Sequence, residues 1–255
     1  MTQAADILLD ATGATVDPAE IARFTKVAEE WWDPEGNFAP LHRLNPTRLA
    51  YIRDRLGQRF DRTGDEPSPF QGLQLLDIGC GGGLVAEPMA RLGFAVTGVD
   101  AAGKSLNIAK AHAAASSLAI DYRAATAEAL AASGERFDVV LALEVIEHVA
   151  ELEAFFAAIR RLVRPGGAVI ISTINRTAKS LALAKIGAEY LLRWVPRGTH
   201  DWKKFLRPSE TAGYCRGAGL AIDDLTGISF DPLTGSWRLS RDLAVNYIMT
   251  ALPEG

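Results

Sequence analysis

The chain has 255 residues and a formal net charge of −4, with 48% hydrophobic and 23% charged residues. This composition is ordinary for a globular protein, and the length suits one large domain or one domain with an elaborated end. The acidic balance argues against nucleic acid as a partner, because nucleic-acid binders usually carry a basic surplus. Two cysteines, Cys80 and Cys215, are too few for a disulfide framework.

The N-terminal residues are not typical of a targeting signal. Its first twenty residues hold four acidic side chains, no basic side chain and no long apolar run, so they do not resemble a secretory or mitochondrial signal. No segment approaches the roughly 18 uncharged apolar residues of a membrane-spanning helix. We therefore expect a cytoplasmic protein.

The first quarter of the chain is expected to be helical. Residues 1–17 are expected to form a loose tail, and residues 18–61 an N-terminal helical cap. Apolar residues recur at helical spacing early in this cap, at Ile21, Phe24, Val27 and Trp31. A second helix is expected from about Asn45. The stretch RTGDEPSPFQG, residues 62–72, is rich in loop-forming residues and separates the cap from the remainder of the chain.

From residue 72 to the C-terminus, short apolar strands alternate with helices. Strands are expected at 73–79, 95–100, 119–125, 137–146 and 168–175, and helices at 84–93, 104–117 and 151–167. This alternation predicts a doubly wound α/β fold, a mostly parallel sheet with helices on both faces. The rhythm breaks at Arg176, where a helical stretch begins, and two strands at 220–231 and 243–252 are expected to complete the sheet.

A glycine-rich loop follows the first expected strand. The sequence LLDIGCGGG places Gly79, Gly81, Gly82 and Gly83 there, and Asp100 ends the second strand 21 residues after Gly79. Glycines let a ligand approach the backbone closely, and an acid in this place can accept both hydroxyls of a ribose. The combination predicts a site for a cofactor that contains a nucleoside. The alternative is a tight turn with a surface aspartate.

The glycine spacing distinguishes between cofactors. A dinucleotide fingerprint needs a small residue at its sixth position, where this chain has Leu84, so a nicotinamide oxidoreductase is disfavoured. Asp77 precedes the first glycine by two residues, and the form D-x-G-x-G-G-G resembles motif I of the class I S-adenosylmethionine-dependent methyltransferases. That resemblance implies a Rossmann-like sheet with a final antiparallel strand, which suits 243–252. It also places Glu128 at the adenine of S-adenosyl-L-methionine.

The end of the fourth expected strand carries three polar groups. In LALEVIEHV, Glu144, Glu147 and His148 stand at i, i+3 and i+4. If Glu144 begins a helical turn, the three side chains converge on one face, where they can hold a divalent cation. Alternatively His148 acts as a general base without metal. The pattern E-V-x-E-H-V also occurs in class I methyltransferases that are not thought to bind metal.

Three stretches carry a closer resemblance. Residues 31–49, 75–100 and 172–210 are similar to segments of the ubiquinone-biosynthesis O-methyltransferases. The resemblance implies S-adenosylmethionine-dependent O-methylation of 2-polyprenyl-6-hydroxyphenol and of 3-demethylubiquinol, with a polyprenyl phenol or quinol as substrate. It is also compatible with association with other proteins of that pathway. Two alternatives remain: a class I methyltransferase that acts on another small molecule, and a lipid-binding protein that keeps a cofactor site for stability.

The same resemblance assigns roles to individual residues. Arg48 would lie at the carboxylate of the cofactor, a group that suits a bidentate guanidinium; the alternative is a surface arginine on an amphipathic helix. Leu143 would line the cofactor pocket near the sulfonium. The cofactor-binding set is then Arg48, Asp77, Gly79, Gly81, Asp100, Glu128 and Leu143. A Mg²⁺-like cation is implied at Glu144, Glu147 and His148, with catalytic roles for Glu144 and His148.

The segment 176–207 is expected to be an inserted helical lid. It holds eight Lys and Arg residues against two acidic residues, a local net charge of +6. Lys185, Glu189 and Arg193 form a narrow polar stripe among apolar residues, as in helices that lie in a lipid interface, and tryptophan suits the headgroup level. We expect the lid to dock on an anionic membrane, which places the protein peripherally on the inner face of the cell membrane. The alternative is a lid that packs only on the protein itself.

The tryptophan pair of the cap has two interpretations. Trp31 and Trp32 either pack the cap against the core, which is the commoner role of tryptophan, or one of them lines the quinol pocket.

Overall fold

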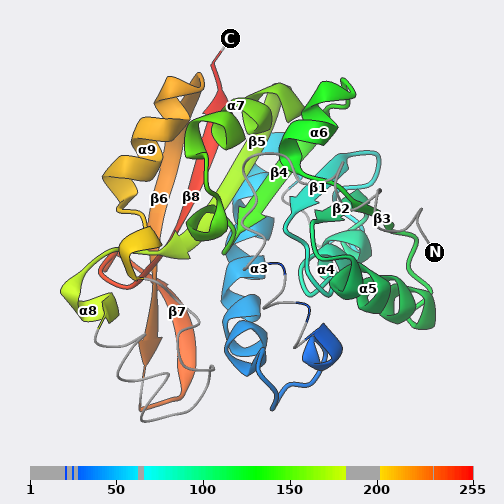
Figure 1. The fold of residues 1–255 in the computed structure, drawn as a ribbon, viewed down its shortest axis with the longest axis horizontal. Coiled ribbons are helices and arrows are strands. Elements are labelled where there is room, and N and C mark those ends of the chain that lie inside the picture. Colours follow the sequence, from blue (N-terminus) through cyan, green and yellow to red (C-terminus); the bar gives the residue numbers. More distant parts are fainter. Residues whose placement is uncertain are drawn as a thin grey trace.

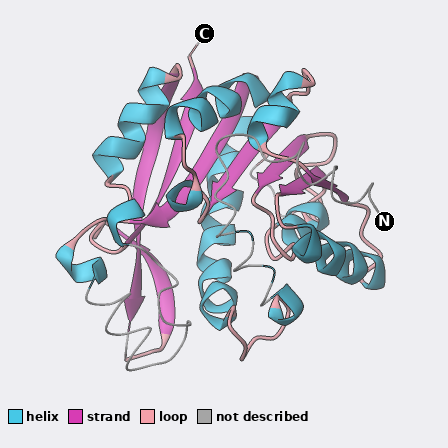
Figure 2. Ribbon diagram, in the orientation of Figure 1, coloured by secondary structure: helices cyan, strands magenta, loops and turns pink. Residues whose placement is uncertain are grey.

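A central sheet organises the chain in the computed structural model, which describes residues 21, 25, 28–62, 66–181, 202–231 and 233–254. Eight strands form one sheet in the order β3-β2-β1-β4-β5-β8-β6-β7. Helices cover both of its faces (Figures 1 and 2). The predicted tail 1–17 and most of the predicted lid, residues 182–201, lie outside the described residues.

The parallel half of the sheet contains the first five strands. They are β1 (Gln74–Ile78), β2 (Ala95–Asp100), β3 (Asp121–Ala124), β4 (Phe137–Leu143) and β5 (Val163–Ile174). Every pairing among them is parallel, which confirms the doubly wound sheet that the alternation predicts.

The antiparallel half follows the lid. It consists of β6 (Leu220–Asp231), β7 (Ser236–Ser240) and β8 (Asn246–Pro253). The predicted final antiparallel strand is confirmed as β8, which lies between β5 and β6 and is antiparallel to both. Strand β7 was not predicted from the sequence. It is a five-residue edge strand, and a short edge strand that buries little leaves a weak pattern in the sequence.

The helices form two layers. The described helices are α3 (Ala39–Phe60), α4 (Ala86–Arg91), α5 (Gly103–Ala115), α6 (Ala127–Ala132), α7 (Leu152–Leu162), α8 (Ala178–Leu181) and α9 (Pro208–Gly217). Short 3₁₀ turns lie at η1 (Ala28–Glu30), η2 (Ile146–His148) and η4 (Trp202–Lys204).

The alternation of side chains along β4 divides the core between the two layers. Val140 and Ala142 belong to the apolar cluster that includes residues of α6, α7 and α9. Val139, Leu141 and Leu143 belong to the cluster that includes residues of α3, α4 and α5. Successive residues of a strand point to opposite faces, so a strand covered on both sides must be apolar throughout. The run VVLAL, residues 139–143, meets that requirement.

Two element boundaries differ from the expectation. Helix α3 begins at Ala39, six residues before Asn45, and includes Pro46. Helix α7 ends at Leu162, and residues 163–167, which were expected to continue it, open β5, where Val163 pairs with Phe137. Pro165 cannot donate the hydrogen bond that a continuing helix needs.

The two described ends of the lid segment meet at its base. The indole Nε1 of Trp202 donates a hydrogen bond to the carbonyl of Thr177 at 3.0 Å, and Arg176 donates to the carbonyl of Lys203 at 3.4 Å. Among the helices of the described part, none is long and apolar enough to cross a membrane.

Candidate active site

The candidate site lies at the carboxyl ends of β1 and β4. These strands are neighbours, while β2 and β3 extend the sheet to one side and β5 to the other. Ligands of doubly wound sheets bind where the strand order reverses in this way. The glycine loop follows β1 and the segment 144–148 follows β4, so the fold brings the two motifs to one edge.

The glycine loop takes a backbone shape that only glycine adopts easily. Gly79 and Gly81 have φ values of 70° and 51°, in the left-handed region that disfavours a Cβ atom. A Cβ on Gly79 would also lie 2.4 Å from Cγ2 of Val145. The loop after β1 therefore packs directly on the loop after β4.

Asp100 holds the glycine loop in place. One carboxylate oxygen accepts the backbone N–H of Gly81 at 2.9 Å, and the other accepts that of Ala102 at 2.7 Å. Burial raises the pKa of Asp100, and the two backbone hydrogen bonds oppose that rise. Each carboxylate oxygen has a second lone pair, so the ribose contact expected of Asp100 stays a compatible prediction.

Helix α3 of the cap places a buried arginine at the carboxyl ends of the strands. Arg48 of α3 is 3% exposed, so the alternative of a surface arginine is wrong. Its Nη2 donates to Oδ1 of Asn45 at 2.6 Å, and Nδ2 of Asn45 donates to the carbonyl of Leu84 at 2.9 Å. The Nη1 atom lies 3.7 Å from Oε1 of Glu144. Burial lowers the pKa of Arg48, and the nearby carboxylates of Glu144 and Asp77 oppose the change.

Several polar atoms at this edge are buried without a hydrogen-bond partner among the described residues. They are Arg48 Nε, Asp77 Oδ2 and both carboxylate oxygens of Glu128. A buried polar atom without a hydrogen-bond partner destabilises the fold, and a bound ligand can supply the missing partner. A guanidinium and a carboxylate side by side fit the carboxylate and ammonium of an amino acid, as in S-adenosylmethionine. Glu128 stands in α6, just after β3, at the same edge of the sheet.

Burial strongly perturbs the carboxyl group of Asp77. The side chain is 3% exposed, and desolvation raises its pKa from 3.8 to about 7 although the charge of Arg48 lowers it. A neighbouring cation would favour the ionised form.

The condition for the predicted convergence of Glu144, Glu147 and His148 on one helical face is not met, because Glu144 does not begin a helical turn. Glu144 has a φ of 55°, and the turn η2 begins only at Ile146. The reversal at Glu144 directs its carboxylate to the hydroxyl of Ser172, which donates to it at 2.8 Å. Within the described ranges, no three His, Cys, Asp or Glu side chains gather as a metal site.

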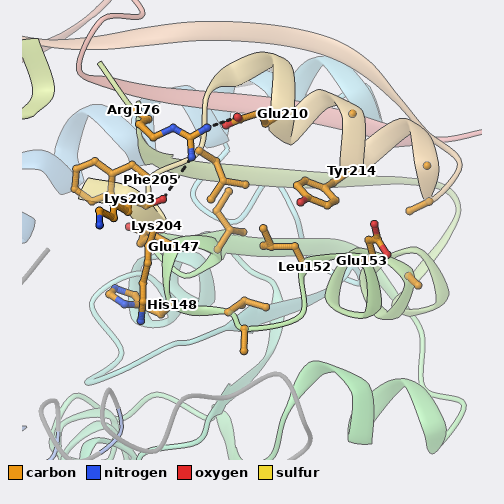
Figure 3. A pocket seen from close by; sticks show the side chains of 18 residues that line it. Glu147, His148, Leu152, Glu153, Arg176, Lys203, Lys204, Phe205, Glu210 and Tyr214 are labelled. Carbon is orange, nitrogen blue, oxygen red and sulfur yellow. Dashed lines mark hydrogen bonds and ion pairs between the residues drawn. The ribbon is translucent and has the colours of Figure 1, made fainter. Parts of the chain in front are cut away.

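Glu147 and His148 lie beyond that reversal. Glu147 is 3% exposed, and its Oε2 accepts the hydroxyl of Thr173 at 2.8 Å. Desolvation and the charge of Glu144 raise the pKa of Glu147 to about 7. Glu147 and His148 both line a cavity between α7 and α9, and Figure 3 shows them together at one end of it.

The tryptophan pair packs the cap on the glycine loop. Trp31 is 8% exposed, stacks on Phe38 with ring centroids 3.7 Å apart, and donates from Nε1 to the Ser105 hydroxyl at 3.0 Å. Trp32 donates from Nε1 to the carbonyl of Gly82 at 2.9 Å. The packing interpretation is therefore confirmed.

A further contact behind Trp32 was not found from the sequence. Its ring stacks on His112 at 3.5 Å, and Nδ1 of His112 lies 2.6 Å from Oε1 of the buried Glu87. The contacts of Trp32 with His112 and of His112 with Glu87 leave no spacing signal in the sequence, since these partners are distant along the chain.

Taken together, the doubly wound sheet, the glycine loop and the unsatisfied charged pair define a class I S-adenosylmethionine-dependent methyltransferase. Residues 76–171 match the family described as a methyltransferase domain. The fold is similar to that of magnesium protoporphyrin IX methyltransferase from Synechocystis with bound SAH, with a TM-score of 0.61 and 18% identity, covering 93% of this chain and 95% of that chain. It is also similar to the PH0226 protein from Pyrococcus horikoshii, with a TM-score of 0.59 and 16% identity, covering 91% of this chain and 99% of that chain.

Curated relatives give the particular family. A protein of Caulobacter vibrioides is 56% identical over 251 residues, 98% of each chain. Proteins of Cereibacter sphaeroides and Brucella anthropi are 55% and 54% identical, covering 94% and 93% of this chain and 98% and 96% of theirs. All three are named ubiquinone biosynthesis O-methyltransferase. The chain belongs to the family of ubiquinone biosynthesis O-methyltransferases.

The contact between Trp31 and Gly82 gives a first prediction. A Cβ added at Gly82 would lie 2.4 Å from Cβ and Cγ of Trp31, atoms too close to the backbone to move aside. We expect Gly82→Ala to lower the free energy of unfolding by about 1–3 kcal/mol and to weaken S-adenosylmethionine binding, as measured by thermal unfolding and calorimetry. Gly213→Ala in α9 is the control, since a Cβ there meets nothing within 4 Å. Equal stability of the two variants would contradict this packing.

The pKa of Asp77 gives a second prediction. Because the pKa rises on folding from 3.8 to about 7, this group makes the free protein less stable as pH increases between those values. The cofactor's ammonium should bind the ionised carboxylate. Affinity should therefore fall below about pH 7, by up to about tenfold per pH unit, and binding near pH 6 should release close to one proton.

Calorimetry in buffers of different ionisation enthalpy measures that proton. Asp77→Asn should bind the cofactor more weakly and release no proton from this site. Proton release that is the same in Asp77→Asn and in the unaltered protein would exclude Asp77 as its source.

Proposed function

We propose that this protein transfers a methyl group from S-adenosylmethionine to a phenolic oxygen of polyprenyl intermediates in ubiquinone biosynthesis. The substrates would be 2-polyprenyl-6-hydroxyphenol and 3-demethylubiquinol. The observation that carries the proposal is the 54–56% identity to enzymes of that name over nearly the whole chain. The unsatisfied charged groups beside the glycine loop support the cofactor.

The residues at this edge suit such a reaction. When bound, S-adenosylmethionine supplies an electrophilic methyl carbon on a sulfonium. Held at Arg48 and Asp77, it would offer that carbon to the phenolic oxygen, and the electron pair of the broken carbon–sulfur bond would leave with sulfur as a neutral thioether. A phenol with an unperturbed pKa of ~10 is a poor nucleophile at neutral pH. We assign the phenolic proton to the imidazole of His148, as a general base. Most of the acceleration then comes from positioning the two reactants.

The expected ligands of a Mg²⁺-like cation do not form a metal site in the described part of the chain. A cation on a catechol oxygen would stabilise the phenolate, and Glu144, Glu147 and His148 were its expected ligands. In the part of the chain described, the three do not fit a metal site, because Glu144 turns toward Ser172 and Arg48. The steps above therefore rely on the chain's own residues, and the cation stays a prediction for experiment.

The third prediction concerns the reaction itself. The protein should transfer labelled methyl from S-adenosylmethionine to a short-tailed demethylubiquinol. Adding magnesium or a chelator tests the role of the cation. Methyl transfer that depends on metal would favour Glu144, Glu147 and His148 as ligands after Glu144 changes its conformation. Methyl transfer without metal would favour His148 as a general base alone. His148→Ala should reduce kcat by about 10²–10⁴-fold. Cofactor binding without transfer to any polyprenyl phenol would favour a methyltransferase of another small molecule.

We propose in addition that the lid segment 176–207 docks on an anionic membrane. The support is its local charge of +6 and its mixture of tryptophan and leucine. Basic residues near anionic lipid contribute about 1 kcal/mol each. At the described ends of the segment, Lys203 and Lys204 are exposed, and the hydrogen bond from Trp202 to Thr177 supports a fixed base for the lid.

The fourth prediction tests docking by flotation with vesicles. The protein should float with vesicles that contain anionic lipid and remain below with neutral vesicles. Replacing Arg197, Lys203 and Lys204 by Glu should abolish flotation with anionic vesicles while S-adenosylmethionine still binds. A variant that floats as well as the unaltered protein would exclude this role for the segment.

A further inference from the structure

A long cavity lies between α7 and α9, on the face of the sheet opposite the cap (Figure 3). Its volume is about 950 Å³, near the upper end of the roughly 300–1,000 Å³ typical of small-molecule sites. It begins at the turn η2, where Glu147 and His148 line it, and it continues along α9 as far as Gly217 and Ala218. The ten residues of α9 correspond to about 15 Å of helix.

Apolar and charged residues both line this groove. Leu152, Phe205, Leu206 and Tyr214 form much of it. Small residues keep it open: Ala157 lies on α7, and Gly213 and Gly217 lie on α9. A Cβ added at either glycine would meet nothing within 4 Å. Ala157, Gly213 and Gly217 are exposed, so the groove is open to solvent at these positions, and larger side chains there would extend into it.

Charged groups around the groove are either paired with one another or exposed. Arg176 forms an ion pair with Glu210 and donates to the carbonyl of Lys203, as Figure 3 shows. Glu153, Lys203 and Lys204 are exposed to solvent. The apolar part of the lining and the ion pair of Arg176 with Glu210 suit an occupant that is elongated and uncharged.

We infer that this groove binds the first isoprenoid units of the substrate's tail. The inference rests on the proposed function. His148, which would take the phenolic proton, lines the groove at the same end as Glu147. A ring held at His148 therefore has Leu152, Leu206 and Tyr214 of the same groove within reach of its tail along α7 and α9. Other occupants, such as the lid segment or a partner helix, would not depend on the tail of the substrate.

Two alanines of α7 offer a matched test. Ala157 and Ala154 are both exposed and lie three residues apart on this helix, but Ala157 lines the groove and Ala154 does not. Ala157→Leu should raise KM for a demethylubiquinol with several isoprene units by about tenfold, the loss expected from about 1.4 kcal/mol of binding. Its KM for the same ring without a tail should not change. Ala154→Leu should leave both KM values unchanged.

A second filling variant covers the case in which Ala157→Leu does not fold. Gly213→Leu enters the groove from α9 and should show the same split between the tailed and tail-less substrates. If the filling variants and Ala154→Leu have equal KM for the tailed substrate, the groove does not bind the tail. A rise that is equal for both substrates would overturn the assignment as well.

The failure of the proposed function is a separate result. It would show in the unaltered protein, as absence of methyl transfer to either the tailed or the tail-less ring while S-adenosylmethionine still binds. Normal transfer by the unaltered protein, without any difference among the three variants, would overturn only the groove assignment.

Discussion

The buried guanidinium of Arg48 is the interaction on which the site depends. A charge that is 3% exposed is tolerated only when anions and hydrogen bonds surround it. Asn45 and the carboxylates of Glu144 and Asp77 provide that surrounding. Because Arg48 and Asn45 belong to α3 while the carboxylates follow or end strands, this one cluster ties the cap to the edge of the sheet. Breaking such a buried pair typically costs about 3–5 kcal/mol.

The left-handed residue Glu144 divides the site into two parts. Before it, β4 ends at Leu143 beside the glycine loop and the cap. After it, the turn η2 directs Glu147 and His148 to the cavity between α7 and α9. Arg48 and Asp77 of the cofactor groups thus lie on the α3 side of the sheet, and the substrate groups of our proposal lie on the α7 and α9 side. Methyl transfer between them would take place across the end of β4.

Much of the architecture could be predicted from the sequence because its causes are local. Strands buried on both faces are short apolar runs, and helices between them repeat at 3.6 residues, so β1 to β5 and the final strand β8 were recognised. The glycine loop and Asp100 were recognised because a backbone with positive φ demands glycine at the end of a strand. Asp77 and Arg48 were placed by resemblance, and the structure buries both.

The sequence by itself determined the class of fold, the cofactor motif and the family. Only the tertiary structure decided how Glu144, Glu147 and His148 are arranged, because the reversal at Glu144 depends on its contacts with Ser172 and Arg48. It alone placed Trp31 against Gly82 and Trp32 on His112, which are far apart in the chain. The groove between α7 and α9 is likewise a product of the tertiary structure. Ala157 and Gly213 face one space only because α7 and α9 pack beside each other on the sheet, and spacing along the chain carries no record of that contact.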